Sequence, residues 1–172
     1  IDQRTLVIYT SDNGPWKLNR GRGGSAYPLR GFKFQTYEGG MRVPCIMRWP
    51  GKVPKGTSCD EVAASIDLMP TIAKLVGADL MKDRKIDGKN IWPLISGIGG
   101  AVSPHEIYYY YKGNRLESAR QGKWKIRRSG KKSQAVELYD LDSDISETKN
   151  LAKENEPLVQ DMIKKMNLFD ED

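Results

Sequence analysis

A short apolar run that stops at a polar turn sets the first limit on how this chain can fold. Residues 5–10 read T-L-V-I-Y-T and are followed by Asp12-Asn13-Gly14-Pro15. Such a run, bounded by turn residues, is typical of a buried strand. Asp12 and Asn13 then lie at the carboxyl end of that strand, where open α/β sheets gather ligands. Their oxygens suit Ca²⁺ or Mg²⁺, although Asp-Asn-Gly-Pro alone is also ordinary turn chemistry.

A second motif spans residues 31–44, which read G-F-K-F-Q-T-Y-E-G-G-M-R-V-P. Its adjacent glycines, Gly39 and Gly40, permit a close backbone approach between a lysine-bearing loop and a strand predicted at residues 43–49. Lys33 offers a compact positive charge with three N–H donors, which suits an oxyanion beside a metal. Most lysines are merely solvated, so this motif is also weak when taken alone.

The remaining elements indicate two regions, residues 1–100 and 101–172. Asp67 is a predicted N-cap of a helix that ends at Gly77 and packs its apolar face on a sheet. After Pro104 the pattern changes to closely spaced strands, followed by a helix that begins after Asn155 and covers one face of an antiparallel sheet. The predicted strands are residues 107–111, 116–120, 124–128 and 136–141, and the helical stripe is Leu158, Val159, Met162, Ile163 and Met166.

The net charge of +6 raises the possibility of nucleic-acid binding. The alternation of Trp124 and Ile126 with basic residues instead predicts a strand with one buried and one solvated face, leading into a turn at Ser129-Gly130. No apolar run approaches membrane-spanning length, and the first ten residues do not form a leader. We therefore expect a soluble chain that binds neither nucleic acid nor membrane. The clustered basic residues are Lys123, Lys125, Arg127, Arg128, Lys131 and Lys132.

Taken together and in this order, the two motifs resemble the sulfatase family, in which S-D-N-G is followed by G-x-K-x-x-x-x-E-G-G-x-R-V-P. The match is complete here. The resemblance continues through Trp49-Pro50-Gly51, residues 66–71, Asp87-Gly88-Lys89-Asn90, Lys123-Trp124-Lys125 and residues 138–141, and so covers nearly the whole chain.

The resemblance implies an α/β fold, the C-terminal portion of an alkaline-phosphatase-like sulfatase, with a small antiparallel sheet and helix as a subdomain. It implies a sulfuric ester hydrolase that binds a divalent cation, usually Ca²⁺. Asp12 and Asn13 are then metal ligands, Lys33 contacts the sulfate group, and Glu38 and Arg42 are structural supports. The substrate is a sulfate ester, for example a sulfated glycan or an aryl sulfate, and the location is periplasmic, secreted or lysosomal.

One part of the family's site is absent from this chain. The nucleophile of the family is a formylglycine made from the Cys or Ser of C/S-x-P-x-R, and neither Cys45 nor Cys59 has that context. We expect the formylglycine and two further aspartate ligands in an N-terminal part of the same protein, upstream of Ile1. The chain alone is therefore predicted to be inactive. Cys45 is interpreted as an ordinary thiol, buried in its strand.

Two alternatives stay open at this point. A phosphodiesterase or phosphonate hydrolase of the same superfamily shares the need for strand-end metal ligands. A non-catalytic module that binds acidic glycans is also compatible with the positive charge.

Two further features are given no functional role. His105 is expected to be a surface loop residue, and Asp140, Asp142 and Asp144 are not expected to form a calcium loop, because the glycine and glutamate of such a loop are missing.

Overall fold

The computed structural model describes residues 1–17, 22–129 and 135–171, which form two compact units of mixed helix and sheet. The first unit comprises residues 1–12 and 44–106, and the second comprises residues 13–43 and 107–172. This grouping does not decide the division at residue 100, which stays a prediction. Gly130, Lys131 and Lys132 lie outside the described residues. No helix in the described ranges is long and apolar enough to cross a membrane.

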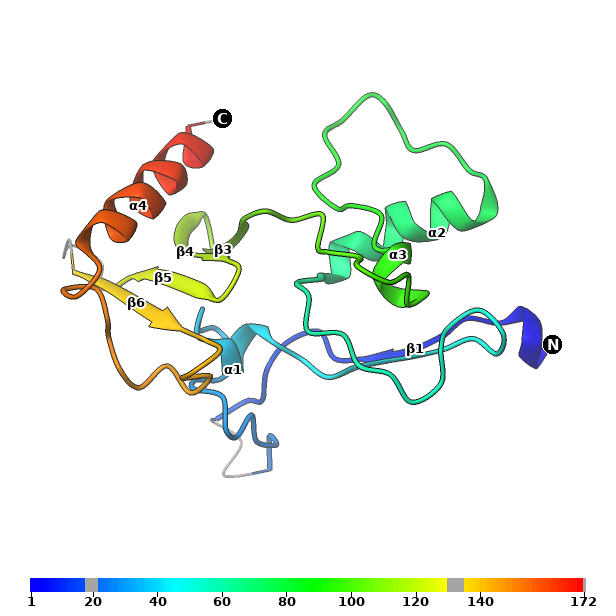
Figure 1. Ribbon diagram of the computed structural model, residues 1–172, viewed down its shortest axis with the longest axis horizontal. Coiled ribbons are helices and arrows are strands. Elements are labelled where there is room, and N and C mark those ends of the chain that lie inside the picture. Colours follow the sequence, from blue (N-terminus) through cyan, green and yellow to red (C-terminus); the bar gives the residue numbers. More distant parts are fainter. Residues whose placement is uncertain (18–21, 130–134, 172) are drawn as a thin grey trace. The chain divides into compact units, whose positions relative to one another are not determined.

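The first unit contains a two-stranded antiparallel ribbon and several short helices (Figure 1). The two strands predicted at residues 5–10 and 43–49 are present, and each begins two residues later than expected. The helix from Asp67 to Gly77 is confirmed, and Gly77 closes it in a left-handed conformation with φ 71°. The elements are η1 (Asp2–Arg4), β1 (Val7–Thr10), β2 (Cys45–Arg48), η2 (Ser65–Asp67), α2 (Leu68–Val76) and α3 (Trp92–Ile95).

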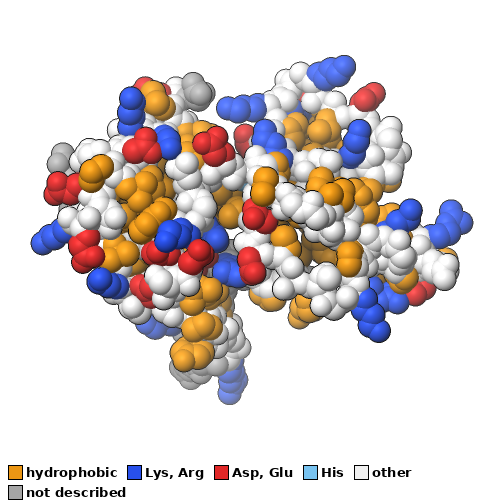
Figure 2. Space-filling model, in the orientation of Figure 1, with side chains coloured by type: hydrophobic (Ala, Val, Ile, Leu, Met, Phe, Trp, Pro, Cys, Tyr) orange, Lys and Arg blue, Asp and Glu red, His pale blue; other side chains and the backbone are white. Residues whose placement is uncertain are grey.

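The prediction that these apolar elements are buried is wrong for this chain. Tyr9 of β1 is 66% exposed, Ile46 of β2 is 63% exposed and Val76 of α2 is 71% exposed. Cys45, expected to be buried, is exposed as well. The physical reason is that β1 pairs only with β2 in the described part of the chain, and a two-stranded ribbon cannot enclose its own side chains. Hydrophobic side chains accordingly reach the surface in Figure 2.

Asp67 and His105 also differ from expectation. The Asp67 carboxylate is buried and makes no capping hydrogen bond to α2. It instead accepts hydrogen bonds from the backbone N–H groups of Ala64 and Lys89, at 2.8 Å and 2.7 Å. Its Oδ1 lies 2.8 Å from Nε2 of His105, whose side chain is only 8% exposed. His105 is therefore a buried partner of Asp67 within the first unit and no surface loop residue.

The second unit is a four-stranded antiparallel meander with strand order β3-β4-β5-β6. All four strands agree with the sequence prediction to within about one residue, as does the C-terminal helix with Asn155 as its N-cap. The elements are α1 (Glu38–Met41), β3 (Tyr108–Lys112), β4 (Arg115–Gln121), β5 (Trp124–Arg128), β6 (Val136–Asp140) and α4 (Glu156–Asp170).

Helix α4 packs its predicted apolar stripe on one face of this sheet (Figure 1). The alternation of side chains along each strand places Ile126 opposite Leu138 on that face, and both are fully buried. The contact confirms that the helix covers the sheet. The buried side chains of this core are Leu116, Ala119, Ile126, Leu138, Val159, Met162 and Met166.

The opposite face of the sheet corrects another prediction. This face of β5 was expected to be solvated, but Lys125 is 0% exposed and the side chain of Arg127 is 11% exposed. Residues of the 30–43 segment cover this face. The carboxylate of Glu38 accepts a hydrogen bond from Lys125, and the hydroxyl group of Thr36 accepts one from Arg127. The sheet of the second unit is thus covered on both faces, with an apolar core on one side and an ionic layer on the other.

Candidate functional site

Two backbone hydrogen bonds join the two sequence motifs within the second unit. The N–H of Gly14 donates to the carbonyl oxygen of Gly40 at 3.1 Å, and the N–H of Lys33 donates to the carbonyl oxygen of Pro15 at 3.0 Å. The turn that follows Asn13 therefore lies directly against the loop that carries Lys33. Asn13 and Lys33, two of the three predicted site residues, are brought into one neighbourhood by these bonds.

Glycine is required at two close backbone contacts, one between the motifs and one within the second motif. A Cβ atom on Gly14 would lie 1.9 Å from the carbonyl oxygen of Gly39, and one on Gly40 would lie 2.1 Å from the carbonyl oxygen of Gln35. Both obstacles are backbone atoms and cannot rotate away. The expected role of the paired glycines in close backbone approach is confirmed.

Replacing Gly40 by alanine is expected to destabilise the second unit by about 1–3 kcal/mol, because the added methyl group forces α1 away from the backbone of the Lys33 loop. Urea denaturation of the chain, followed by the exchange of β5 amide protons, measures this change. Gly99→Ala is the control, because nothing lies within 4 Å of a Cβ atom added there. An equal effect of the two substitutions would show that the contact at Gly40 is loose.

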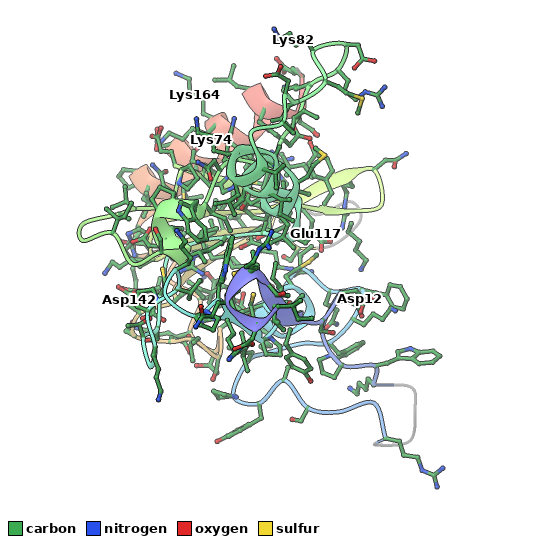
Figure 3. All side chains as sticks on the ribbon, turned by 90° about the vertical axis from the view of Figure 1, so that its right-hand side faces the viewer. Asp12, Lys74, Lys82, Glu117, Asp142 and Lys164 are labelled. Carbon is green, nitrogen blue, oxygen red and sulfur yellow. The ribbon has the colours of Figure 1, made fainter. Side chains whose placement is uncertain are left out.

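The three predicted site residues have different surroundings. Asp12, which belongs to the first unit, is exposed two residues after the end of β1 (Figure 3). Asn13 and Lys33 are half-buried. Among the described residues, the Lys33 ammonium group has no ion-pair partner, and it lies 5.4 Å from the ring centroid of Phe34.

Behind the Lys33 loop lies a buried ion network that the sequence analysis did not predict. Lys125 Nζ lies 2.7 Å from Oε1 of Glu38 and 3.1 Å from Oε1 of Glu147. The second contact lacks hydrogen-bond geometry, so that Glu147 oxygen has no hydrogen-bond partner among the described residues. The other Glu147 oxygen accepts the backbone N–H of Glu38 at 2.7 Å. Glu38 is thus a structural support that fixes α1 to the sheet.

Charge and burial act in opposite directions within this network. Burial raises the pKa of Glu147, the nearby Lys125 opposes that shift, and the negative charge of Glu38 adds to it. For Glu117, burial also opposes ionisation, but the hydrogen bond from Thr36 and the charge of Arg127 together hold its pKa below the ordinary value of 4.5. Thr36 donates to Glu117 at 2.6 Å, and Arg127 donates to Thr36 at 3.1 Å. The ionic layer therefore favours the charged form of Glu117, whereas the charged form of Glu147 is disfavoured.

Glu117→Gln is expected to destabilise the second unit most at neutral pH. A carboxyl group with a lowered pKa in the folded state stabilises that state above its ordinary pKa, and the contribution is lost as pH falls through the folded pKa. The difference in unfolding free energy between the parent chain and Glu117→Gln should thus be constant above about pH 4.5 and shrink below it. Urea titrations from pH 3 to 7, with exposed Glu171→Gln as the control, measure it. A difference that grows in acid would contradict the assignment.

Arg42 and the aspartates at 140 and 144 have local contacts in the structure. Arg42 is exposed and its backbone N–H closes α1 at the Glu38 carbonyl oxygen, so a supporting role for its side chain stays a prediction. Asp140 pairs with Lys123 at 2.7 Å, and Asp144 accepts hydrogen bonds from the backbone N–H groups of Thr148 and Lys149. That this turn is no calcium loop stays a prediction. The sequence carried no local signal for the buried network, because Glu38, Lys125 and Glu147 come from three separate segments.

The described residues supply only part of a metal site. Across residues 1–17, 22–129 and 135–171, no three His, Cys, Asp or Glu side chains gather as a cation site would require. Asp12 and Asn13 fit the chemistry of a hard cation, since both offer oxygen atoms and Asp12 is solvent-accessible. A Ca²⁺ ion takes about six to eight oxygen ligands, so most must come from elsewhere.

Comparison with known proteins gives one consistent family. The family described as N-sulphoglucosamine sulphohydrolase, C-terminal, matches residues 32–171. The arylsulfatase of Hemicentrotus pulcherrimus is 35% identical over 142 residues, which cover 83% of this chain and 25% of that protein. Arylsulfatase A of Homo sapiens is 43% identical over 109 residues, which cover 63% of this chain and 21% of that protein.

Solved structures agree with this family. The crystal structure of Ps i-CgsB in complex with k-i-k-neocarrahexaose matches with a TM-score of 0.82 and 30% sequence identity. The match covers 98% of this chain and 37% of that one. The described fold is therefore present within a larger protein, and the chain spans about a quarter or less of the length of these two curated relatives.

Proposed function

Because this chain belongs to the sulfatase family, we propose that it is the C-terminal part of an enzyme that hydrolyses sulfate esters. The observation that carries the proposal is the pair of backbone hydrogen bonds that hold the Asn13-Gly14-Pro15 turn against Lys33 and Gly40. They bring an oxygen donor for a metal and the ammonium group of Lys33, which has no ion-pair partner among the described residues, into one neighbourhood. Hydrolysis of a sulfate ester needs both kinds of group near the sulfuryl oxygens.

The proposed roles follow from the chemistry of each side chain. Asp12 and Asn13 offer oxygen ligands for a divalent cation, which we propose is Ca²⁺. When bound, that cation polarises a sulfuryl oxygen and stabilises the charge that develops on it. Lys33 contacts another sulfuryl oxygen with its ammonium group and holds the sulfate in place. Glu38 acts indirectly, because its ion pair with Lys125 fixes the helix that follows the Lys33 loop.

The rest of the site is proposed to come from an upstream part of the same protein. This chain contains no C/S-x-P-x-R stretch, so we place the formylglycine that supplies the attacking oxygen in that upstream part, with two further aspartate ligands. The exposed apolar side chains of β1, β2 and α2 support this assignment, since a larger sheet and its helices would bury them. The upstream part is therefore a structural partner as well as the source of the nucleophile.

The substrate is proposed to be a sulfate ester, either a sulfated glycan or an aryl sulfate. Curated relatives include proteins called arylsulfatase, steryl-sulfatase and N-acetylgalactosamine-6-sulfatase, and the first and third of these names match an aryl and a sugar leaving group. A periplasmic, secreted or lysosomal location, as the resemblance implies, stays a prediction.

The experiment compares the chain alone with the chain joined to its upstream part, using an aryl sulfate as substrate. We expect no turnover by the chain alone. The joined protein should hydrolyse the ester, lose activity in a chelator and regain it with Ca²⁺. Asp12→Ala should raise the Ca²⁺ concentration needed for half-maximal activity by about tenfold or more, because a charged ligand is lost.

Four outcomes would change this proposal. Sustained turnover by the chain alone would show that a nucleophile has been overlooked in it. Faster hydrolysis of a phosphate diester than of the sulfate ester would favour a phosphodiesterase of the same superfamily. Activity that survives exhaustive removal of metal would contradict the roles given to Asp12 and Asn13. A glycan-binding module would bind sulfated sugars with no turnover in the joined protein.

A further inference from the structure

An open groove of about 530 Å³ lies beside the Lys33 loop in the second unit. Pro15, whose carbonyl oxygen bonds the Lys33 N–H, forms part of its wall, and so does Phe32, the residue before Lys33. The groove therefore begins next to the residue proposed to hold the sulfate. Its volume is within the range of ligand sites, which is about 300–1,000 Å³.

The charges in this groove have one sign. Lys17 and Arg30 line it, and no acidic side chain does so among the described residues. Lys17 Nζ lies 5.2 Å from the ring centroid of Phe32, and the Arg30 guanidinium carbon lies 4.1 Å from that of Tyr37. Arg30 is further fixed by donating to the carbonyl oxygen of Glu147 at 2.7 Å. Both cations are thus held over aromatic rings, where they can meet an anion with little further ordering.

Tyr27 supplies a different kind of surface. It also lines the groove, and it is 90% exposed, so it does not serve the packing of this unit. An exposed aromatic ring beside fixed cations suits a ligand that presents apolar C–H faces between anionic groups. A sugar ring that carries more than one sulfate has that arrangement. A simple aryl leaving group brings no second anion for Lys17 and Arg30.

We propose that the groove lined by Lys17, Tyr27 and Arg30 is a subsite for a multiply sulfated carbohydrate, next to the ester that is hydrolysed. The inference rests on the proposed function, and it names the substrate class of that same site. In the subsite, Lys17 and Arg30 bind sulfate groups on sugars adjacent to the scissile one, and Tyr27 packs on a sugar face. Lys33 contacts the sulfate group whose ester is hydrolysed.

The test measures binding by the 172-residue chain, which needs no turnover. A heparin-derived tetrasaccharide and its chemically desulfated counterpart are titrated into the chain while backbone amide chemical shifts are recorded. We expect the sulfated probe to shift the amides of the groove, and Lys17→Gln and Tyr27→Ala each to raise its Kd about fivefold to tenfold. Lys164→Gln is the matched control, because this exposed lysine of α4 (Figure 3) carries the same charge and does not line the groove.

Every result decides the proposal. Equal binding of the sulfated and desulfated probes, no saturable binding by the parent chain, or equal effects of Lys17→Gln and Lys164→Gln would overturn it. Chemical-shift spectra of each variant show whether it folds. If Lys17→Gln does not fold, the binding measured with Tyr27→Ala tests the proposal by itself. In the joined protein, the two groove substitutions should lower the ratio of kcat/KM for the tetrasaccharide to kcat/KM for an aryl sulfate. If that protein hydrolyses no sulfate ester, the proposed function fails while the binding result still stands.

Discussion

Replacing Lys125 by methionine is expected to lower the unfolding free energy of the second unit by about 3–5 kcal/mol, which is typical when one partner of a buried ion pair is removed. Lys125 is completely buried between Glu38 and Glu147. Without its ammonium group the two carboxylates face each other in a buried environment, and the cation that remains, Arg120, lies 3.7 Å from Glu38. Methionine fills much of the space left by the lysine chain, so the loss reports on charge and only slightly on packing.

Urea denaturation at pH 7, followed by circular dichroism and by the exchange of β-sheet amides, measures this loss. Lys123→Met is the matched control, because Lys123 lies beside the same strand and pairs with Asp140 at the surface, where an ion pair contributes little. Adding Glu147→Gln to Lys125→Met should recover part of the stability, since it removes one of the two facing charges. Equal losses for Lys123→Met and Lys125→Met would mean that the network is hydrated in solution.

The second unit could be predicted well from sequence because its signals are local. The turn at Gly113-Asn114 separates β3 from β4, and the side-chain alternation around Ile126 marks one face of β5 as apolar. The stripe of α4 is also local, with its residues spaced three and four apart. Each of these patterns depends on neighbours within one or two elements, so strand ends and the apolar core agree with the structure.

The errors come from contacts between distant parts of the chain. Lys125 and Arg127 have the sequence pattern of a solvated face, and only the 30–43 segment, about 90 residues earlier, makes that face buried. His105 and Asp67 are separated by 38 residues, and nothing in the Ser103-Pro104 context indicates their contact. Cys45 and Tyr9 show the opposite error. Their apolar strands predict burial, but both residues are exposed, because the described residues provide no element that covers them.

The candidate site is intermediate between these two cases. The order of the two motifs indicated Asp12, Asn13 and Lys33, and the structure adds the backbone hydrogen bonds that place Asn13 near Lys33. What the sequence could not indicate is the ionic layer that supports the loop, since it requires Glu38, Lys125 and Glu147 to meet from three separate segments. The metal-binding role of Asp12 and Asn13 and the sulfate-binding role of Lys33 stay predictions.

Lys33→Ala in the chain joined to its upstream part is expected to lower kcat/KM for an aryl sulfate by about 10²–10³-fold, the usual effect of removing one group that stabilises transition-state charge. The reason is electrostatic, because the leaving aryl oxide and the sulfuryl oxygens carry negative charge in the transition state that the ammonium group of Lys33 would neutralise. Folding should change little, since no described residue forms an ion pair with Lys33. Steady-state kinetics and urea denaturation of the same preparations separate the two effects.

The matched control is Lys164→Ala, which removes an exposed lysine of α4 from the same unit. Lys33→Arg should retain part of the activity if the role is purely one of charge, and little of it if the compact ammonium group is needed between substrate and metal. The pattern across the three variants therefore distinguishes a point-charge contact from a structural role. A kcat/KM for Lys33→Ala within about threefold of the parent enzyme, which is under 1 kcal/mol of transition-state stabilisation, would remove Lys33 from the site. The sulfate contact would then have to come from another cation, with Lys17 as the first residue to examine, because it lies over Phe32 beside the same loop.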